Sequence, residues 1–224
     1  MEVLILSKTH FGNNVCVGGM VLANNQYVRL LNLGGWYQFA DTEFEIGDVY
    51  DVRFTPSTSI REPHNEDVII QSQTYLGTIE NLSEFILSEG VTIWRGSINN
   101  IFEGKIRWAN SGAGFLSANI QNYPNHSVGF WLSDEDLSYE NDHYFYPTGS
   151  AFTKRKLKYK GMPDAIDTVP ANTLLRVSLA KWWKPADSDV EERCYVQLSG
   201  WYDDDDHVAN YDNEYREPLD DFPF

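Results

Sequence analysis

The sequence predicts a mainly β protein that is built from two small β-barrels and carries one or two short helices. Its apolar residues fall in short runs, and several runs alternate with polar residues at a period of two, which is typical of half-buried strands. Turn residues separate the runs at short intervals, as they do in barrels and sandwiches. Strands do not alternate with long helical segments, which excludes a doubly wound parallel sheet. At 224 residues, the chain accommodates two five-stranded barrels with a boundary near residue 90.

The first barrel is expected within residues 1–90. A glycine pair at 18–19 interrupts the second apolar run and predicts a bulge or sharp bend, and an asparagine pair at 24–25 predicts a hairpin turn. Asn81 and Glu84 form a capping-box pattern, which predicts a short helix near 81–89. The expected strands cover residues 3–6, 15–22, 26–31, 49–54 and 67–71.

The second barrel is expected within residues 91–202, which repeat the same style of short apolar runs. Glycines and prolines between these runs mark turns. The remaining residues, 203–224, have no apolar periodicity and form an acidic tail. The expected strands cover residues 98–106, 114–120, 127–132, 144–146, 154–159, 173–179 and 193–198.

The charge of the chain is unevenly distributed. Its 33 acidic and 17 basic residues give a net charge of −16, which argues against a protein that coats long polyanions. Half of the net charge lies in the acidic tail, which contains nine acidic residues and one basic residue. Residues 154–202 instead contain nine basic and six acidic residues, so a local basic site fits the sequence. The tail is interpreted as a solubilising extension, as a segment that competes for the protein's own basic surface, or as a docking site for a partner.

Several features indicate a cytoplasmic protein with no membrane segment. No apolar run approaches the ~18 residues needed to span a bilayer, and the run at residues 3–6 is too short for the core of a signal peptide. The two cysteines, Cys16 and Cys194, both lie in apolar stretches. We interpret them as reduced, buried thiols rather than as a disulfide.

Familiar enzyme motifs are absent from the sequence. The chain has no Gly-rich phosphate-binding loop that ends in Gly-Lys, no dinucleotide-binding glycine pattern and no Gly-x-Ser-x-Gly nucleophile elbow. His64 and Glu66 match the first half of the zinc deaminase signature, but two isolated cysteines cannot supply its second half. The sequence therefore favours a binding protein over an enzyme, and it predicts no catalytic residue, cofactor or metal.

His64, Glu66 and Asp67 form the first candidate cluster, directly before an expected strand. Three ionisable groups so close together can bind a ligand or a divalent cation, or take part in acid/base chemistry. The alternative is a turn in which the carboxylates cap backbone N–H groups and the histidine packs locally.

A basic stripe forms the second candidate. Alternate residues of a strand share one face, so four lysines at this spacing would lie on the same side. Such a stripe suits a track of backbone phosphates. The alternative is an edge strand that lysines protect against pairing with another sheet. The basic stripe consists of Lys154, Lys156, Lys158 and Lys160.

The richest candidate lies on two expected strands near the C-terminus, within residues 174–184 and 193–202. If these strands pair, cations and aromatic rings share one surface, which suits stacked bases and phosphates. The alternative is that the tryptophans complete the core and the arginines pair with Glu191, Glu192 or the acidic tail. The shared surface would contain Arg176, Ser178, Lys181, Trp182 or Trp183, Arg193, Tyr195 and Gln197.

Several of these motifs resemble the bacterial dual-OB-domain (DuOB) family over about residues 1–202. The longest matches are Leu174-Leu-Arg-Val-Ser-Leu-Ala-Lys-Trp-Trp183 and Glu192-Arg-Cys-Tyr-Val-Gln-Leu-Ser-Gly-Trp-Tyr202. Shorter matches are Leu6-Ser-Lys-Thr9, Val15-Cys-Val-Gly-Gly19, Tyr27-Val-Arg-Leu-Leu31, Gly47-Asp48, Pro63-His-Asn-Glu-Asp67 and Ser127-Val-Gly-Phe-Trp131.

The resemblance implies two tandem OB-like small β-barrels. It also implies a nucleic-acid or nucleotide-binding role in prokaryotic antiphage systems. Through the matched motifs it implies the candidate ligand-binding residues Lys8, Arg29, His64, Glu66, Asp67, Arg176, Lys181, Trp182, Arg193 and Gln197.

The sequence leaves three functional hypotheses. The leading one is a binding module that recognises single-stranded nucleic acid or a nucleotide within a prokaryotic antiphage system. The second is a protein-interaction subunit of a defence complex, or an antagonist whose acidic tail mimics nucleic acid. The third is an enzyme, such as a metal-dependent phosphodiesterase, with its chemistry around His64, Glu66 and Asp67.

Overall fold

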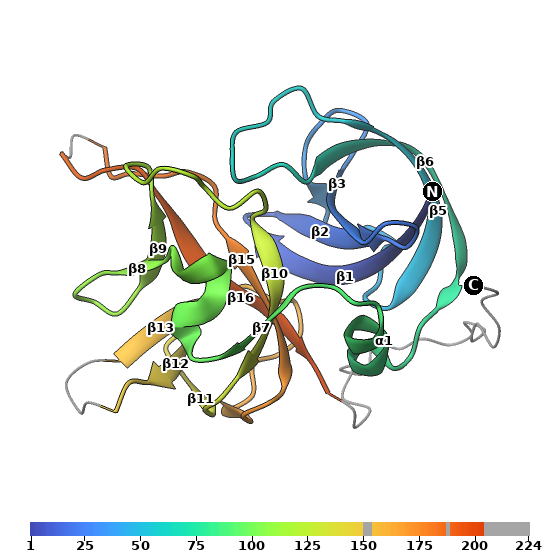
Figure 1. The fold of residues 1–224 in the computed structure, drawn as a ribbon. Helices are drawn as coiled ribbons and strands as arrows, with labels where there is room; N and C mark the ends of the chain where they lie inside the picture. Colours follow the sequence, from blue (N-terminus) through green and yellow to red (C-terminus); the bar gives the residue numbers. More distant parts are fainter. Residues whose placement is uncertain (150–153, 187–188, 204–224) are drawn as a thin grey trace.

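Five strands in the first half of the chain close into a barrel, and a larger sheet follows it (Figure 1). These features come from a computed structural model that describes residues 1–149, 154–186 and 189–203. The mainly β fold class predicted from the sequence is therefore confirmed. The acidic tail beyond residue 203, for which the sequence analysis gives three interpretations, lies outside the described residues.

The barrel closes because β1 pairs with both β2 and β5, while β3 pairs with β6 in parallel. A short strand, β4, extends the sheet beside β2. This strand order is that of a small OB-like barrel. The strands are β1 Glu2–Phe11, β2 Asn14–Val21, β3 Gln26–Leu31, β4 Gln38–Phe39, β5 Asp48–Pro56 and β6 Asp67–Thr78.

The first strand is apolar on both faces. Val3 and Ile5 point into the barrel, where they join a buried cluster with residues of the other barrel strands. Leu4 and Leu6 belong to a separate buried cluster on the outside of the barrel. Because successive side chains of a strand alternate in direction, this continuous apolar run serves two cores.

A bulge is present opposite the glycine pair, on β1 rather than in the second run itself. The register of β1 and β2 shifts where Ile5 faces Gly19 and Ser7 faces Gly18, so β1 has one extra residue there. A Cβ atom at Gly19 would lie 2.8 Å from the backbone oxygen of Leu4. Glycine is therefore required at position 19 by the close approach of β1.

The expected helix is also present. Helix α1 covers Leu82–Ser88, and the side chain of Asn81 caps it by accepting a hydrogen bond from the backbone N–H of Glu84. Leu82 and Ile86 are buried against the outside of the barrel. The boundary predicted near residue 90 falls between α1 and β7.

The second half forms a ten-stranded sheet with its own apolar core. Its central strand is β16, which pairs with β13, β15 and β9. The strands are β7 Ile93–Gly96, β8 Arg107–Trp108, β9 Gly114–Ser117, β10 Val128–Ser133, β11 Leu137–Glu140, β12 His143–Pro147, β13 Lys154–Tyr159, β14 Thr168–Val169, β15 Leu174–Leu179 and β16 Arg193–Tyr202.

The strand predicted at residues 98–106 is wrong. The segment forms a 3-10 helix, η1, over Ile98–Gly104, capped by the side chain of Ser97. Phe102 and Glu103 take left-handed backbone angles, with φ of 50° and 53°. The apolar residues here are buried as predicted, but their spacing does not distinguish a strand from a short helix.

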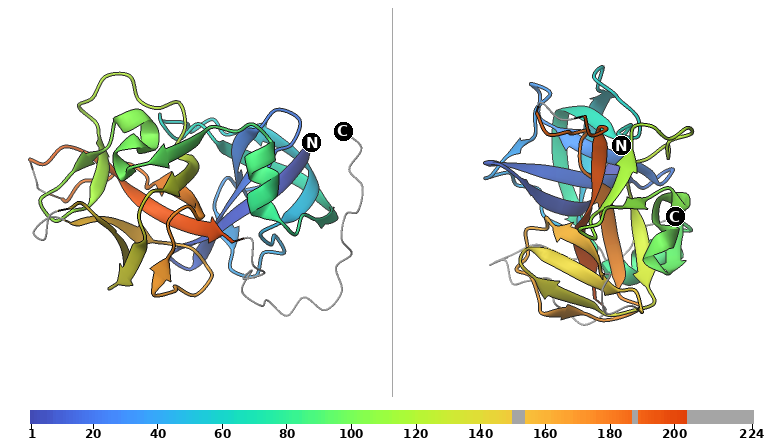
Figure 2. Two further views of the ribbon diagram at one scale, coloured as in Figure 1. Left: turned by 60° about the horizontal axis from the view of Figure 1, so that its bottom comes forward. Right: turned by 90° about the vertical axis from the view of Figure 1, so that its left-hand side faces the viewer.

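The barrel and the sheet pack side by side and share a buried apolar joint (Figure 2). The hydroxyl of Tyr202 on β16 donates a 2.5 Å hydrogen bond to the backbone oxygen of Leu6 on β1. Near the C-terminal end of β1, the backbone N–H of His10 donates to the oxygen of Lys160 at 2.9 Å. The buried joint consists of Leu4, Leu6, Met20, Val49, Leu82, Ile86, Phe130, Leu132, Leu174 and Tyr202.

Two further expectations concern the thiols and the membrane. Cys16 and Cys194 are both free thiols; Cys194 is buried and Cys16 is half-buried. Within the described ranges, the helices are too short or too polar to cross a membrane.

Candidate functional site

A cavity of about 290 Å³ lies between the barrel and the sheet. The barrel contributes residues of β1, β2 and β3 and of the turn between β1 and β2, and the sheet contributes residues of β10, β15 and β16. The cavity gathers five of the ten candidate ligand-binding residues and one lysine of the basic stripe. These residues are Arg29, Glu66, Arg176, Lys181, Gln197 and Lys160.

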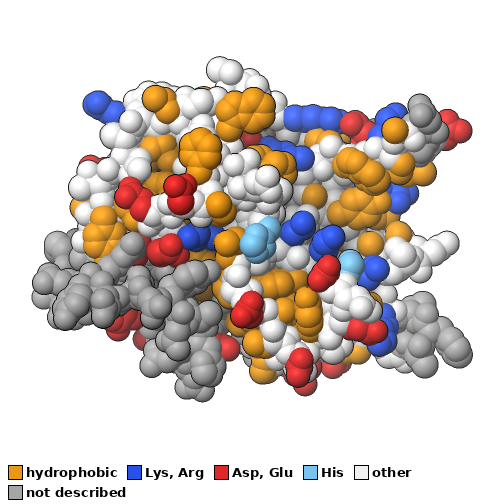
Figure 3. All heavy atoms as spheres, turned by 180° about the vertical axis from the view of Figure 1, so that it is seen from behind, with side chains coloured by type: hydrophobic (Ala, Val, Ile, Leu, Met, Phe, Trp, Pro, Cys, Tyr) orange, Lys and Arg blue, Asp and Glu red, His pale blue; other side chains and the backbone are white. Residues whose placement is uncertain are grey.

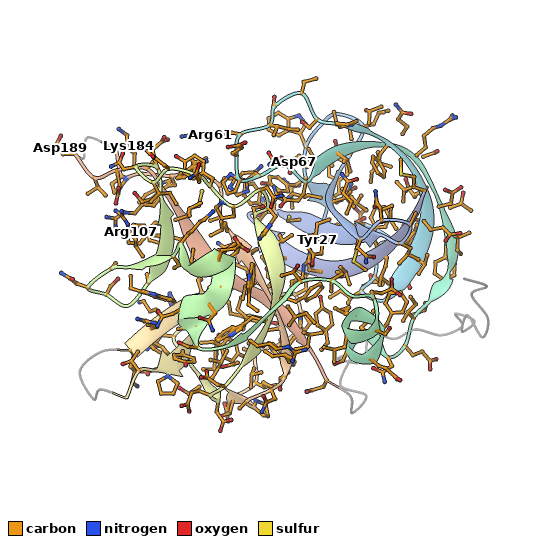
Figure 4. The ribbon with its side chains drawn as sticks, viewed as in Figure 1. Tyr27, Arg61, Asp67, Arg107, Lys184 and Asp189 are labelled. Carbon is orange, nitrogen blue, oxygen red and sulfur yellow. The ribbon has the colours of Figure 1, made fainter. Side chains whose placement is uncertain are left out.

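Arg176 on β15 is the most deeply buried cation of this site. Its side chain is 1% exposed, and its Nε donates a 3.1 Å hydrogen bond to Ser7 Oγ. The guanidinium carbon lies 5.4 Å from the ring centroids of both Tyr27 and Phe130. Figure 4 shows Tyr27 on the side of the barrel that faces the sheet. The two rings hold the guanidinium in place and favour its charge.

The positive charge of Arg176 is not neutralised by any carboxylate among the described residues. Its Nη1 is buried without a hydrogen-bond partner in that part of the chain. A buried guanidinium without a carboxylate is costly, and a bound anion would remove that cost. Gly18 leaves room at the guanidinium, because a Cβ atom there would lie 3.2 Å from Arg176 Nη2.

Asp67 links two other cations of the cavity across the joint. It accepts a hydrogen bond from Arg29 Nη1 at 2.6 Å and one from Lys181 Nζ at 2.7 Å. Arg29 and Asp67 are register partners on the parallel pair β3–β6, while Lys181 follows β15. Figure 4 shows Asp67 where the barrel faces the sheet. The carboxylate therefore positions both cations and neutralises part of their charge.

Glu66 makes a second link across the joint. Its carboxylate accepts hydrogen bonds from the backbone N–H of Ser127 and from Ser127 Oγ, the latter at 2.8 Å. Arg29 Nη2 donates to the same Ser127 Oγ at 3.3 Å. Ser127 is fully buried. The sequence did not single out Ser127 as a site residue, although it lies in one of the motifs that carry the family resemblance.

His64 is buried beside this network and stays uncharged. Burial lowers its pKa to about 2, and the positive charges of Arg29 and Lys181 add to the shift. Its Nε2 lies 3.6 Å from Cys194 Sγ, and burial raises the pKa of that thiol to about 12. A neutral imidazole next to a protonated thiol is a packed pair rather than an activated nucleophile.

The side chains of residues 64–67 are not arranged as the ligands of a metal ion. Both carboxylates, Glu66 and Asp67, are engaged by Ser127, Arg29 and Lys181. Across the residues that the structure describes, no three His, Cys, Asp or Glu side chains are arranged to hold a metal ion. In this arrangement, the carboxylates of the cluster hold the neighbouring cations in position.

A groove of about 530 Å³ adjoins the cavity and shares Lys160, Lys181 and Gln197 with it. Lys156 and Lys158 of the basic stripe line the groove, as does Trp183. Figure 3 shows several Lys and Arg side chains beside a histidine near the middle of one face, with hydrophobic, Asp and Glu side chains around them. The fourth lysine of the stripe, Lys154, instead lies 5.4 Å over the ring of Phe145.

The edge-strand interpretation of the basic stripe is wrong. Strand β13 pairs with β12 on one side and with β16 on the other, so it lies inside the sheet. Its lysines therefore do not protect an open edge. Burial, with the charge of Lys158, lowers the pKa of Lys160, which indicates that an anion beside Lys160 would be favourable.

Lys8 and Trp182 do not line the cavity. Lys8 Nζ forms a 2.8 Å ion pair with Glu45. Trp182 Nε1 donates a 2.7 Å hydrogen bond to the backbone oxygen of Glu62, and the guanidinium of Arg61 lies over its ring. The structure therefore places Lys8 and Trp182 in structural contacts of their own.

Arg193 also lies away from the cavity. It forms a 3.5 Å ion pair with Glu191, and its guanidinium lies 3.9 Å over the ring of Phe115. The sequence left open whether the arginines bind a ligand or pair with nearby carboxylates. Pairing is observed for Arg193, whereas Arg176 has no such partner among the described residues.

The sequence missed an aromatic pair that lines the cavity. The rings of Phe11 and Tyr37 stack with centroids 3.9 Å apart, and Phe11 is 48% exposed. Burial raises the pKa of Tyr37 to about 12, so its hydroxyl stays protonated. Phe11 precedes the turn glycine between β1 and β2, and Tyr37 follows a glycine pair, which is the type of loop position where binding residues gather.

The comparison with known proteins agrees with this fold. No curated protein and no solved structure matches the chain. The model of a family described as a dual OB-containing domain, DuOB, matches residues 1–201. The match spans most of the chain, including the barrel and the residues that line the cavity, so this protein belongs to the dual OB-containing domain family.

Proposed function

We propose that the protein is a binding module for single-stranded nucleic acid or a nucleotide, and that a phosphate of the ligand occupies the cavity between the barrel and the sheet. The observation that carries the proposal is the guanidinium of Arg176. It lines the cavity, is 1% exposed and has no carboxylate partner among the described residues. Guanidinium groups bind phosphate with particular strength, because their donors match its oxygens.

The charge of the cavity supports an anionic ligand. Lys160 and Lys181 lie in the same lining as Arg176, while the lining carboxylate, Glu66, is engaged by Ser127. Asp67 neutralises only part of the charge of the cations around it, since it contacts two of them. A local excess of positive charge on a chain of net charge −16 favours a discrete ligand over a coated polymer.

The size and the aromatic lining support a nucleotide. The cavity volume of about 290 Å³ is close to the lower limit for small-molecule sites, which span roughly 300 to 1,000 Å³. The ring of Phe11 is stacked on Tyr37 and is 48% exposed, so one of its faces is available to a base. Stacking on an aromatic ring tolerates any base, because every base has a π-face.

Fluorescence anisotropy with labelled nucleotides and short oligonucleotides, measured across salt concentrations, tests the proposal. We expect binding at low salt that weakens as salt rises. Arg176→Met should reduce affinity at least tenfold. Arg53→Met, which removes an exposed cation that does not line the cavity, should leave affinity unchanged. Absence of binding by every probe at low salt, or equal affinity of the two variants, would contradict the proposal.

We also propose a bacterial, cytoplasmic setting in which the protein serves a prokaryotic antiphage system and works with a protein partner. The two free thiols support a reducing compartment. The antiphage setting rests on the family resemblance alone. Capture of partners from phage-infected and uninfected cells that express the tagged protein tests it, and a partner set that does not change with infection would count against it.

A further inference from the structure

We propose that the cavity and the adjoining groove form one site for an end of single-stranded nucleic acid, with a terminal phosphate in the cavity and the following nucleotides along the groove. This inference rests on the proposed function and makes it specific. It assigns a ligand class, a phosphorylated strand end, and a direction in which the strand leaves the cavity.

The first argument for a single site is that the cavity and the groove are continuous. They share Lys160, Lys181 and Gln197. Gln197 on β16 lies in register with Lys158 on β13 and with Ser178 on β15. The cavity therefore opens onto the basic stripe across three neighbouring strands. A chain that leaves the cavity on this side meets these lysines, and no Asp or Glu among the described residues lines the groove.

The groove has the two features that binding sites for single-stranded nucleic acid combine, a row of cations and a set of aromatic rings. Lys156 and Lys158 are alternate residues of β13 and Lys160 directly follows its end, so the three form a row with a spacing of about 6.6 Å. A row of cations can follow a phosphate backbone, while aromatic side chains stack the bases. The groove contains such side chains in Trp183 and Tyr195, whose ring centroids lie 6.3 Å apart.

Trp183 is suited to stacking because it is both exposed and anchored. Its side chain is 54% exposed. Its backbone N–H donates to the oxygen of Arg193 at 3.0 Å, and the N–H of Arg193 donates back at 2.9 Å. Because the backbone of Trp183 is already held in place, stacking of a base has to order only the rotamers of its side chain, which limits the entropy cost.

The interior position of Arg176 favours a strand end over the middle of a strand. The guanidinium is 1% exposed, so a phosphate must enter the interior to reach it, and the cavity is small, at about 290 Å³. A continuous chain would have to enter and leave through the same space. A terminal phosphate monoester also carries a charge of about −1.5 to −2 at neutral pH, which suits a site with several cations better than a singly charged diester.

Competition anisotropy with oligonucleotides of one sequence tests this inference. The probes are a 5′-phosphorylated strand, a 3′-phosphorylated strand, an unphosphorylated strand and a circular strand, each as DNA and as RNA, with a nucleoside monophosphate for comparison. We expect one phosphorylated end to bind at least tenfold tighter than the unphosphorylated and circular strands. We also expect that strand to bind tighter than the monophosphate.

Amino-acid substitutions test the roles of the cavity and of the groove separately. Arg176→Met should abolish the preference for a phosphorylated end. Lys158→Met and Trp183→Ala should weaken the phosphorylated strand at least fivefold more than they weaken the monophosphate. Lys105→Met is the matched control, because Lys105 is bonded to the backbone of Asn122 and lies outside the groove.

The possible outcomes distinguish this inference from the proposed function. Equal affinity for circular and phosphorylated strands would overturn end recognition but leave nucleic-acid binding in place. A phosphorylated strand no tighter than the monophosphate would overturn the role of the groove and leave nucleotide binding in place. If no probe binds, both proposals fall.

Discussion

Arg176 and Arg29 are both buried at the cavity, but within the described part of the chain only Arg29 of the two has a carboxylate partner. Arg29→Met should therefore lower the free energy of unfolding by about 3 kcal/mol, since it leaves Asp67 with Lys181 alone. Arg176→Met leaves no carboxylate unpaired and should change that free energy by less than about 1 kcal/mol. Urea denaturation of the two variants measures the difference. A loss at Arg176→Met as large as that at Arg29→Met would show that Arg176 is a structural residue.

His64 makes stability depend on pH. Its pKa is about 2 in the folded protein against 6.5 for a free histidine, so the unfolded chain takes up a proton below pH 6.5 while the folded one does not. The free energy of unfolding should therefore fall as pH falls from about 6.5 towards 2, by up to about 1.4 kcal/mol per pH unit from this group.

Urea denaturation between pH 7 and pH 5 checks the role of His64. His64→Asn removes the titrating group, so the variant should show a shallower loss of stability over this range than the original protein. Parallel slopes in the two proteins would mean that His64 is accessible to protons in the folded state.

At the residue scale, the sequence identifies which side chains are charged or aromatic, but it does not identify the residues that they contact. Arg176 and Arg193 lie on paired strands with similar surroundings in the sequence. Arg193 pairs with Glu191 two residues away, whereas Arg176 packs between two aromatic rings, one from each half of the chain. Asp67 and Lys181 meet across 114 positions of sequence. Such pairings depend on how the two halves pack, which no local pattern encodes.

Helix α1 supports the joint from the outside of the barrel. Its Asn81 cap is exposed and bonds the N–H of Glu84. Asn81→Ala should lower the free energy of unfolding by about 1 kcal/mol through loss of this cap. Nucleotide affinity should not change, because α1 does not line the cavity. Thermal denaturation together with anisotropy checks both statements, and a loss of affinity would reveal coupling between the joint and the cavity.

At the element scale, alternating strands were predictable and short or mixed elements were not. Strand β13 agrees with the predicted bounds, and β15 differs by one residue, because both alternate clearly between apolar and polar residues. The two-residue strands β4, β8 and β14 have too few residues for any period. The sequence predicts a strand where η1 forms. The apolar residues Ile98, Ile101 and Phe102, all buried in the structure, have a spacing that suits a strand or a short helix.

For the whole molecule, the distribution of charge sets the field that an anionic ligand meets. Residues 204–224 contain eight acidic residues and one basic residue. Deleting them should raise the affinity for oligonucleotides several-fold at low salt, because a large negative charge repels the ligand. The gain should shrink at high salt, where charges are screened. Anisotropy at two salt concentrations measures it, and unchanged affinity at low salt would show that the tail does not affect the site.

The joint between barrel and sheet gives the molecule its candidate site. The cavity lining comes from both halves, and the hydrogen bond from Ser127 to Glu66 and the ion pair of Lys181 with Asp67 cross between them. The sequence indicated a small basic site on an acidic chain. It did not indicate that the site lies between the two halves, because that depends on the packing of β1 against β16.

A crystal structure of the protein with a 5′-phosphorylated or 3′-phosphorylated dinucleotide tests the central claim most directly. We predict a terminal phosphate in the cavity, in contact with the guanidinium of Arg176, and a second nucleotide directed towards Lys158 and Trp183. A dinucleotide bound on the outer surface of the barrel, with the cavity free of ligand, would contradict the account.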